Sequence, residues 1–200
     1  MLAVPLLPPE VINEGPRRKR FTREEVQRML EAGVFGGQRF ELIDGELIDK
    51  MGQNPPHAVA IRRLLKWLSS IIESELILIQ LPIDVSDGDR ERSLPEPDLA
   101  VVGEWSSEHL HRHPRGDEMR LVIEVSDGTV AFDISRKSTL YARAGVPQYW
   151  VLNLVRRMLV VHRESDGTQN RHIDLYSEKD VVWLEGAGSV KVAEILPPRT

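Results

Sequence analysis

The chain contains no cysteine among its 200 residues. This absence excludes a disulfide framework, a thiolate zinc site and a cysteine nucleophile. The sequence also lacks an apolar run of the roughly 20 residues that a membrane-spanning helix needs. The short apolar run within residues 1–9 has no preceding basic residue and no cleavage site, so it is not typical of a signal peptide. We therefore expect a cytoplasmic protein with no membrane span.

Motifs that mark several other enzyme classes are missing as well. The sequence has no G-x-S-x-G, no glycine-rich phosphate loop and no H-E-x-x-H. Their absence argues against a nucleophile-elbow hydrolase, a P-loop nucleotide hydrolase and a zinc protease of the H-E-x-x-H type.

Positive charge is also scarce overall. Lysine and arginine number 26 against 31 acidic residues, a formal net charge of −5, which argues against tight, non-specific binding to a phosphate backbone. Basic residues nonetheless gather at 17–20, 62–66 and 156–157. Each cluster either contacts phosphate or is an ordinary solvated face, and the sequence leaves both readings open. A cation-binding carboxylate site would itself make the net charge more negative.

Composition divides the chain into two parts. Residues 1–20 are rich in proline and charge, which predicts a flexible N-terminal arm. Residues 21–200 have the length of one domain with one core. We expect this domain to end in a C-terminal β extension.

The expected elements are helices interspersed with short strands. A capping-box pattern at Thr22 and Glu25 starts a helix that Gly33 ends, and Asp44-Gly45 between two β-like runs predicts a hairpin. A long helix is expected from residue 54 and another over 133–144. Further strands are expected at 76–85, 98–102, 119–126, 148–152, 158–163 and 171–176. This order predicts an α/β (α+β) fold with a central mixed β-sheet flanked by helices.

Two carboxylates break the apolar pattern of these strands. In the strand at 119–126, Leu121 and Ile123 point to one face, and Glu124 points to the other with Val122. A buried carboxylate is costly unless it is paired, protonated or bound to a cation. Asp98 heads another short apolar strand in the same way. The plainer alternatives are a salt bridge at a strand end for Glu124 and a turn residue after proline for Asp98.

Lys137 interrupts an apolar helix face. It lies near the middle of a stripe formed by Ile134, Leu140, Tyr141 and Ala144. Lysine is rarely buried unless it is paired, although its stem can also follow apolar surface to reach water. A lysine that reached from this face toward Glu124 and Asp98 would satisfy all three charges together.

These three residues suit phosphodiester hydrolysis. Carboxylates from separate strands supply the oxygen ligands that Mg²⁺ or Mn²⁺ requires, and a nearby ammonium can orient water and stabilise charge on the phosphate. Asp98, Glu124 and Lys137 form this minimum set. Glu41, on the expected hairpin, could complete it, but alone it is most simply an exposed hairpin carboxylate.

The histidines are less informative. His109, His111 and His113 alternate in a polar loop, a spacing that permits a zinc site on one side of an extended segment but matches no known finger. Their role stays open. His57 opens the long helix, where packing at the helix start is the plainer reading and contact with phosphate or water is the alternative.

An ordered set of segments resembles a known family. They are FELIDGE at 40–46, PDLAVV at 97–102 and LVIEVSD at 121–127, then Asp133, Lys137, YARAGVP at 141–147 and YW at 149–150. Together they closely resemble the Uma-two family of candidate restriction endonucleases, a branch of the PD-(D/E)XK nuclease superfamily. The resemblance covers about residues 21 to 165.

The resemblance implies a restriction-endonuclease-like fold and an acidic site at Glu41, Asp98 and Glu124. The superfamily has a lysine two residues after the second acidic residue, where this chain has Ser126. Lys137 looks like the migrated lysine of this family. The glutamate that usually precedes Tyr-Trp is Gln148 here. The implied partner is DNA, and a homodimer is an expectation because nucleases of this fold often need two copies to cut both strands.

The sequence thus favours an Mg²⁺- or Mn²⁺-dependent endonuclease. Glu41, Asp98 and Glu124 would bind the metal, and Lys137 would position the attacking water. The alternative is a catalytically inactive nucleic-acid-binding or protein-interaction module on the same fold, since fold does not fix function. A glycoside hydrolase that uses the carboxylates as acid and base is disfavoured, because Lys137 has no required part in that chemistry.

Overall fold

The fold is built on one six-stranded sheet, described in a computed structural model over residues 18–50 and 54–199. Its strands are β3 (Ile77–Ile79), β4 (Leu99–Val102), β5 (Met119–Ser126), β6 (Gln148–Asn153), β7 (Met158–Ser165) and β8 (Asn170–Ser177), in that order. Only β5 and β6 are parallel, and the other neighbours are antiparallel. The central sheet is therefore mixed, as predicted. Most of the expected arm at 1–20 lies outside the described residues.

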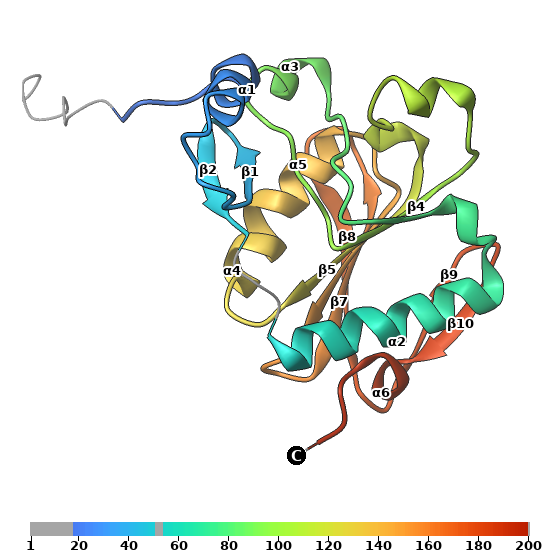
Figure 1. The fold of residues 1–200 in the computed structure, drawn as a ribbon. Coiled ribbons are helices and arrows are strands. Elements are labelled where there is room, and N and C mark those ends of the chain that lie inside the picture. Colours follow the sequence, from blue (N-terminus) through green and yellow to red (C-terminus); the bar gives the residue numbers. More distant parts are fainter. Residues whose placement is uncertain (1–17, 51–53, 200) are drawn as a thin grey trace, which may run out of the picture.

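Helices cover both faces of this sheet (Figure 1). The long helix α2 (Pro55–Ile71) and the short α6 (Val192–Ile195) lie on one face, with a core that includes Leu64, Leu121 and Trp150. The opposite face carries α5 (Ser138–Arg143) and the hairpin of β1 (Phe40–Ile43) and β2 (Glu46–Asp49). Ile43 and Val122 belong to the core on that side. The fold prediction of a mixed sheet flanked by helices is confirmed.

The first helix and the hairpin form where their signals predict. α1 (Arg23–Glu31) has a complete capping box, in which Thr22 and Glu25 each bond the other's backbone N–H. In the hairpin turn, Asp44 and Gly45 have φ values of 49° and 79°, the left-handed pair that a two-residue turn of this hand requires. The turn fixes the register that opposes Glu41 to Ile48.

Two predicted elements differ in the structure. The strand expected over 76–85 is only β3, because Gln80 has φ 48° and Pro82 cannot donate to a ladder. The helix expected over 133–144 consists of α4 (Val130–Phe132), a π-helical turn (Asp133–Lys137) and α5. In that turn the Ser138 N–H bonds to the Asp133 carbonyl, five residues back.

The remaining elements pack around the sheet. A hairpin of β9 (Val181–Leu184) and β10 (Gly188–Lys191) forms a separate two-stranded sheet beside α2, and Val182, Leu184 and Val190 join the core on that face. Short helical turns make up the rest: α3 (Asp87–Arg90) and 3₁₀ turns at Ser74–Leu76, Ser107–Leu110 and Gly116–Glu118. No helix within residues 18–50 and 54–199 has the length and hydropathy to cross a membrane.

Candidate active site

A cavity of about 360 Å³ opens on the hairpin side of the sheet. Its lining comes mainly from the hairpin, the start of α2, Asp98 just before β4, the end of β5 with the loop after it, and the π-helical turn. Six acidic side chains line it, against two lysines and one histidine: Glu41, Asp49, Asp98, Glu124, Asp127 and Asp133. A cavity so rich in carboxylates attracts cations.

The ammonium of Lys137 bridges two of these acids. Its Nζ lies 2.8 Å from Glu41 Oε1 and 2.8 Å from Glu124 Oε1. All three side chains are buried, and Lys137 is only 3% exposed. Three segments that are distant in the sequence therefore meet at one buried ammonium. The alternatives of a Lys137 that reaches solvent and a Glu41 exposed on the hairpin do not hold.

Two further contacts fix the two glutamates. The Tyr141 hydroxyl donates to Glu124 Oε1 at 3.1 Å, and the Glu96 backbone N–H donates to Glu41 Oε2 at 3.2 Å. The Lys137 and Tyr141 donors both use Oε1 of Glu124. Elsewhere in the described chain no donor bonds Oε2 of Glu124, so this oxygen is available for a ligand.

One ammonium does not fully neutralise two buried carboxylates. Burial raises the pKa of Glu124 above its ordinary value, although the Lys137 charge opposes this shift. Burial alone would lower the pKa of Lys137, but the charges of Glu124 and Glu41 raise it. Lys137 therefore stays protonated and acts as a hydrogen-bond donor and a fixed positive charge, not as a base.

Asp98 lies in the same cavity and has different partners. Its Oδ2 accepts the Val125 backbone N–H at 2.9 Å, and His57 Nε2 lies 3.2 Å from the same oxygen. Burial would raise the pKa of Asp98, but the hydrogen bond and charge of His57 hold it below the ordinary value. The structure thus places Asp98 beside His57, and not at the Lys137 ammonium as the sequence analysis suggested.

Two residues of the cavity have larger roles than the sequence pattern indicates. For His57 the pattern favours packing at the helix start, but its ring lines the cavity and contacts Asp98. Asp133, 4% exposed, was noted only within a family motif; its Oδ2 accepts the Thr129 hydroxyl at 2.6 Å. Burial raises the pKa of Asp133. Its position one helical turn before Lys137 is the signal that could have indicated it.

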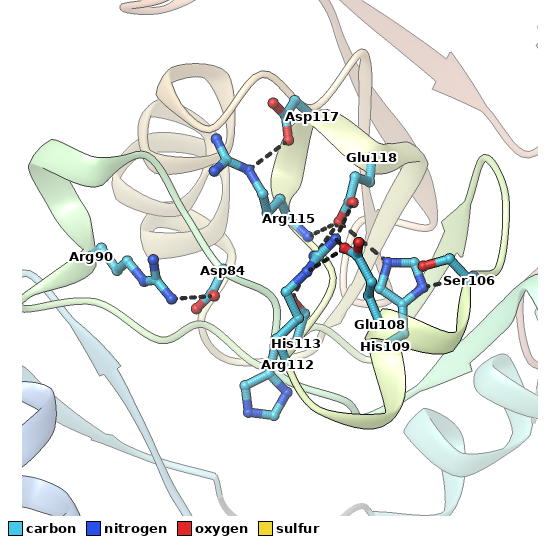
Figure 2. A network of polar contacts seen from close by, with 10 residues as sticks. All are labelled: Asp84, Arg90, Ser106, Glu108, His109, Arg112, His113, Arg115, Asp117 and Glu118. Carbon is cyan, nitrogen blue, oxygen red and sulfur yellow. Dashed lines mark hydrogen bonds and ion pairs between the residues drawn. The ribbon is translucent and has the colours of Figure 1, made fainter.

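His109, in the 109–113 loop, belongs to a polar network (Figure 2), and none of the three histidines of this loop lines the cavity. His109 Nδ1 accepts the Ser106 N–H, and its Nε2 lies 3.4 Å from Glu118 Oε2. Arg112 donates to Glu118 as well, and the His113 ring points away from His109. Both nitrogens of His109 are thus used in holding the loop, which argues against the zinc reading.

The acidic residues fit a hard divalent cation of the kind that needs few protein ligands. Within residues 18–50 and 54–199, no three carboxylate, thiol or imidazole side chains are arranged to hold a metal ion by themselves. Mg²⁺ is usually bound by one or two carboxylates, with water and substrate phosphates completing its shell. Asp98 directly precedes β4 and Glu124 lies in the neighbouring strand β5, and each retains an oxygen that no donor of the described chain bonds. The donor set is therefore compatible with Mg²⁺ or Mn²⁺.

Comparison with known proteins agrees with this fold. The model of the Uma2 family, which carries the description "Putative restriction endonuclease", matches residues 23–195. A crystal structure described as a "putative nuclease belonging to DUF820" from Anabaena variabilis ATCC 29413 is similar, with a TM-score of 0.58. The identity is 11%, over 78% of this chain and 88% of that chain, so this likeness shows the fold alone. No curated protein matches the chain.

Proposed function

Since this chain belongs to the Uma2 family, described as "Putative restriction endonuclease", we propose that it is an Mg²⁺- or Mn²⁺-dependent endonuclease that hydrolyses phosphodiester bonds, with DNA as substrate. Asp98 and Glu124 would hold the cation, with the third predicted acid, Glu41, beside them as a partner of Lys137. Lys137 would position the attacking water and stabilise the charge that grows on the phosphate. The observation that carries the proposal is the buried Lys137 ammonium, which lies 2.8 Å from each of two carboxylates at the wall of an open cavity.

The position of Lys137 suits a fixed positive charge. Because its ammonium is anchored by Glu41 and Glu124, it needs no reorganisation when negative charge grows on the phosphate. Its third N–H can orient a water molecule for attack on phosphorus. Since the two glutamates raise the pKa of Lys137, the lysine keeps its proton throughout.

The acidic side chains would also bind the divalent cation. Asp98 Oδ1 and Glu124 Oε2 are the oxygens through which the cation would be held, because no donor of the described chain bonds them. Both oxygens of Glu41 are already engaged, by Lys137 and by the Glu96 N–H. When bound, the divalent ion supplies Lewis acidity to the phosphoryl group and makes water easier to deprotonate. The six acidic side chains of the cavity repel a bare phosphodiester, so the substrate binds only together with cations.

The deciding experiment is DNA cleavage by the purified full chain. Supercoiled plasmid and labelled oligonucleotides are incubated with Mg²⁺, with Mn²⁺ or with EDTA. We expect cleavage with either metal and none with EDTA. D98N, E124Q and K137Q should each lower the cleavage rate by about 100-fold or more, the scale on which loss of a preorganised charge acts.

A matched control separates the site from general effects of charge. Glu118 is also ion-paired, to Arg112 at 2.7 Å, but it lies outside the cavity. E118Q should keep the cleavage rate of the parent chain. Cleavage that continues unchanged in E124Q and K137Q would show that the activity arises elsewhere.

The cleavage assay, together with measurements of oligonucleotide and Mn²⁺ binding, tests the inactive-module alternative. A chain that binds oligonucleotides with Mn²⁺ absent, binds no Mn²⁺ and cuts nothing would be a binding module on a nuclease fold. A homodimer, which would present two such cavities to the two strands of DNA, remains an expectation that sedimentation of the full chain would measure.

A further inference from the structure

Several acids of the cavity are anchored by donors at particular oxygens. In Asp98 both donors meet at one atom: the Val125 N–H and His57 Nε2 share Oδ2. The other oxygen, Oδ1, has no donor in the described chain. A carboxylate held twice at one oxygen has its plane fixed, and its second oxygen is presented in a constant direction. Asp98 is only 4% exposed, so these protein donors, and not solvent, fix the orientation of its carboxylate.

The His57 ring is itself held in place by its backbone. Asn54 caps α2, and its Oδ1 accepts the His57 N–H at 3.0 Å. The Asn54 amide nitrogen donates to Asp127 Oδ2, which ties the start of α2 to the loop after β5. The imidazole therefore reaches Asp98 from a capped helix terminus, and not from a mobile side chain on a loop.

Within the described chain, Asp98 is the one hydrogen-bond partner of the His57 ring. Nδ1 of His57 is buried and has no hydrogen-bond partner in the described chain. The neighbouring carboxylate assigns the proton to Nε2, so that His57 donates to Asp98. Because a buried polar atom without a partner is costly, this arrangement gives up one hydrogen bond to make the other.

We infer that His57 is a positioning residue of the metal site: by holding Oδ2 of Asp98, it directs Oδ1 toward the cation. This inference rests on the proposed function and extends it to a residue that the acidic motif does not include. His57 acts through Asp98 and does not touch the substrate or the reacting atoms. Partners of metal ligands in this role typically change metal affinity by about 10–100-fold when they are removed.

Isothermal titration of Mn²⁺ into the full chain, without DNA, tests the inference. H57A should weaken Mn²⁺ binding by about 10-fold. H57Q should restore most of the affinity, because its amide nitrogen can reach the place of Nε2 and donate to Oδ2. H109Q is the matched control, since His109 also pairs with a carboxylate, Glu118, but outside the cavity. Its Mn²⁺ affinity should equal that of the parent chain.

A double-mutant cycle with D98N separates positioning from direct ligation. If His57 acts only through Asp98, H57A should weaken Mn²⁺ binding by less than about 2-fold in the D98N background. A further 10-fold loss there would overturn the inference in favour of His57 as a ligand. Equal affinity of H57A and the parent chain would overturn it as well.

The proposed function fails in a different way. If D98N itself binds Mn²⁺ as tightly as the parent chain, the metal site is not at Asp98, and both proposals fall. If D98N weakens binding and H57A does not, the function stands and the role of His57 falls. Thermal unfolding of each variant by circular dichroism identifies any variant that does not fold, in which case H57Q, compared with H109Q, decides.

Discussion

The two faces of strand β5 are buried to a similar extent but differ in what they bury. Leu121, Ile123 and Val125 point toward α2 and are surrounded by apolar side chains. Glu124, between them in the sequence, points to the hairpin side, where it meets a lysine, a tyrosine and further acids. Alternation along a strand thus separates a face that stabilises the fold from a face that carries charge.

The two faces of β5 also differ in what makes burial of their side chains stable. Apolar burial toward α2 is favourable by itself, about 25 cal/mol per Å². The charged cluster on the other face is stable only as a set, because desolvation of each member must be offset by its partners. Proteins retain such clusters where chemistry requires them, and strongly shifted pKa values, as at Glu124 and Lys137, are typical of active sites.

The largest effect should come from removing the partner of two buried charges. K137M keeps most of the side-chain volume but leaves Glu41 and Glu124 without their shared cation. We expect a loss of about 3–5 kcal/mol in the free energy of unfolding at pH 7.5, measured by urea titration. The loss should grow from pH 7.5 to pH 9, because burial raises the pKa of Glu124 to about 8 and the Lys137 ammonium is needed most where this acid is ionised.

K137M combined with E124Q is the control for this prediction. It removes one of the two stranded carboxylates and should recover part of the lost stability. A K137M chain as stable as the parent would mean that the buried glutamates do not need the ammonium, and the contrast between the two faces of β5 would disappear.

Much of this arrangement could be predicted from sequence, because the signals are local. The capping box at Thr22, the Asp44-Gly45 turn and the alternation of β5 each depend on neighbours a few residues away. The side of β5 that carries Glu124 follows from the same alternation. The helical face of Lys137 could be predicted because α5 continues regularly after it.

The remainder depends on contacts that no local pattern encodes. Ile134 was expected on the buried face but is 38% exposed, because the π-helical turn changes the helical phase ahead of Lys137. The His57–Asp98 pair joins residues 41 positions apart and depends on how α2 docks against β4 and β5. Charge balance pairs Asp98 with Lys137 in the sequence, but it does not identify which cation meets which acid in the fold.

A second prediction concerns a polar group on the hairpin side that has no partner. His162 is 1% exposed, and neither of its ring nitrogens has a hydrogen-bond partner in the described chain. Burial lowers its pKa from 6.5 to about 4. Between these values the unfolded chain binds the proton and the folded chain does not, so stability is present above pH 6.5 and is lost as the pH falls toward 4.

H162F should remove this dependence. Phe fits beside the Tyr149 ring, whose centroid is 5.4 Å from that of His162, and it forfeits no hydrogen bond. The difference in unfolding free energy between H162F and the parent chain should grow by on the order of 2–3 kcal/mol from pH 7 to pH 4. H172Q, at an exposed histidine, is the control for general acid effects. Parallel pH profiles for H162F and the parent chain would contradict the assignment.

The smallest change in stability should come from a substitution on the apolar face of β5. This substitution tests most directly whether the two faces of β5 act separately. I123V removes one methylene group from a fully buried side chain next to Glu124 in the sequence. We expect a loss of about 0.5–1.5 kcal/mol in the free energy of unfolding. Mn²⁺ affinity and the rate of DNA cleavage should stay within about 2-fold of the parent chain, because the lost group faces α2 and additivity holds for sites that share no partner. If I123V weakened Mn²⁺ binding as much as H57A, the sheet would transmit packing changes to the cavity, and the two faces could not be treated as separate.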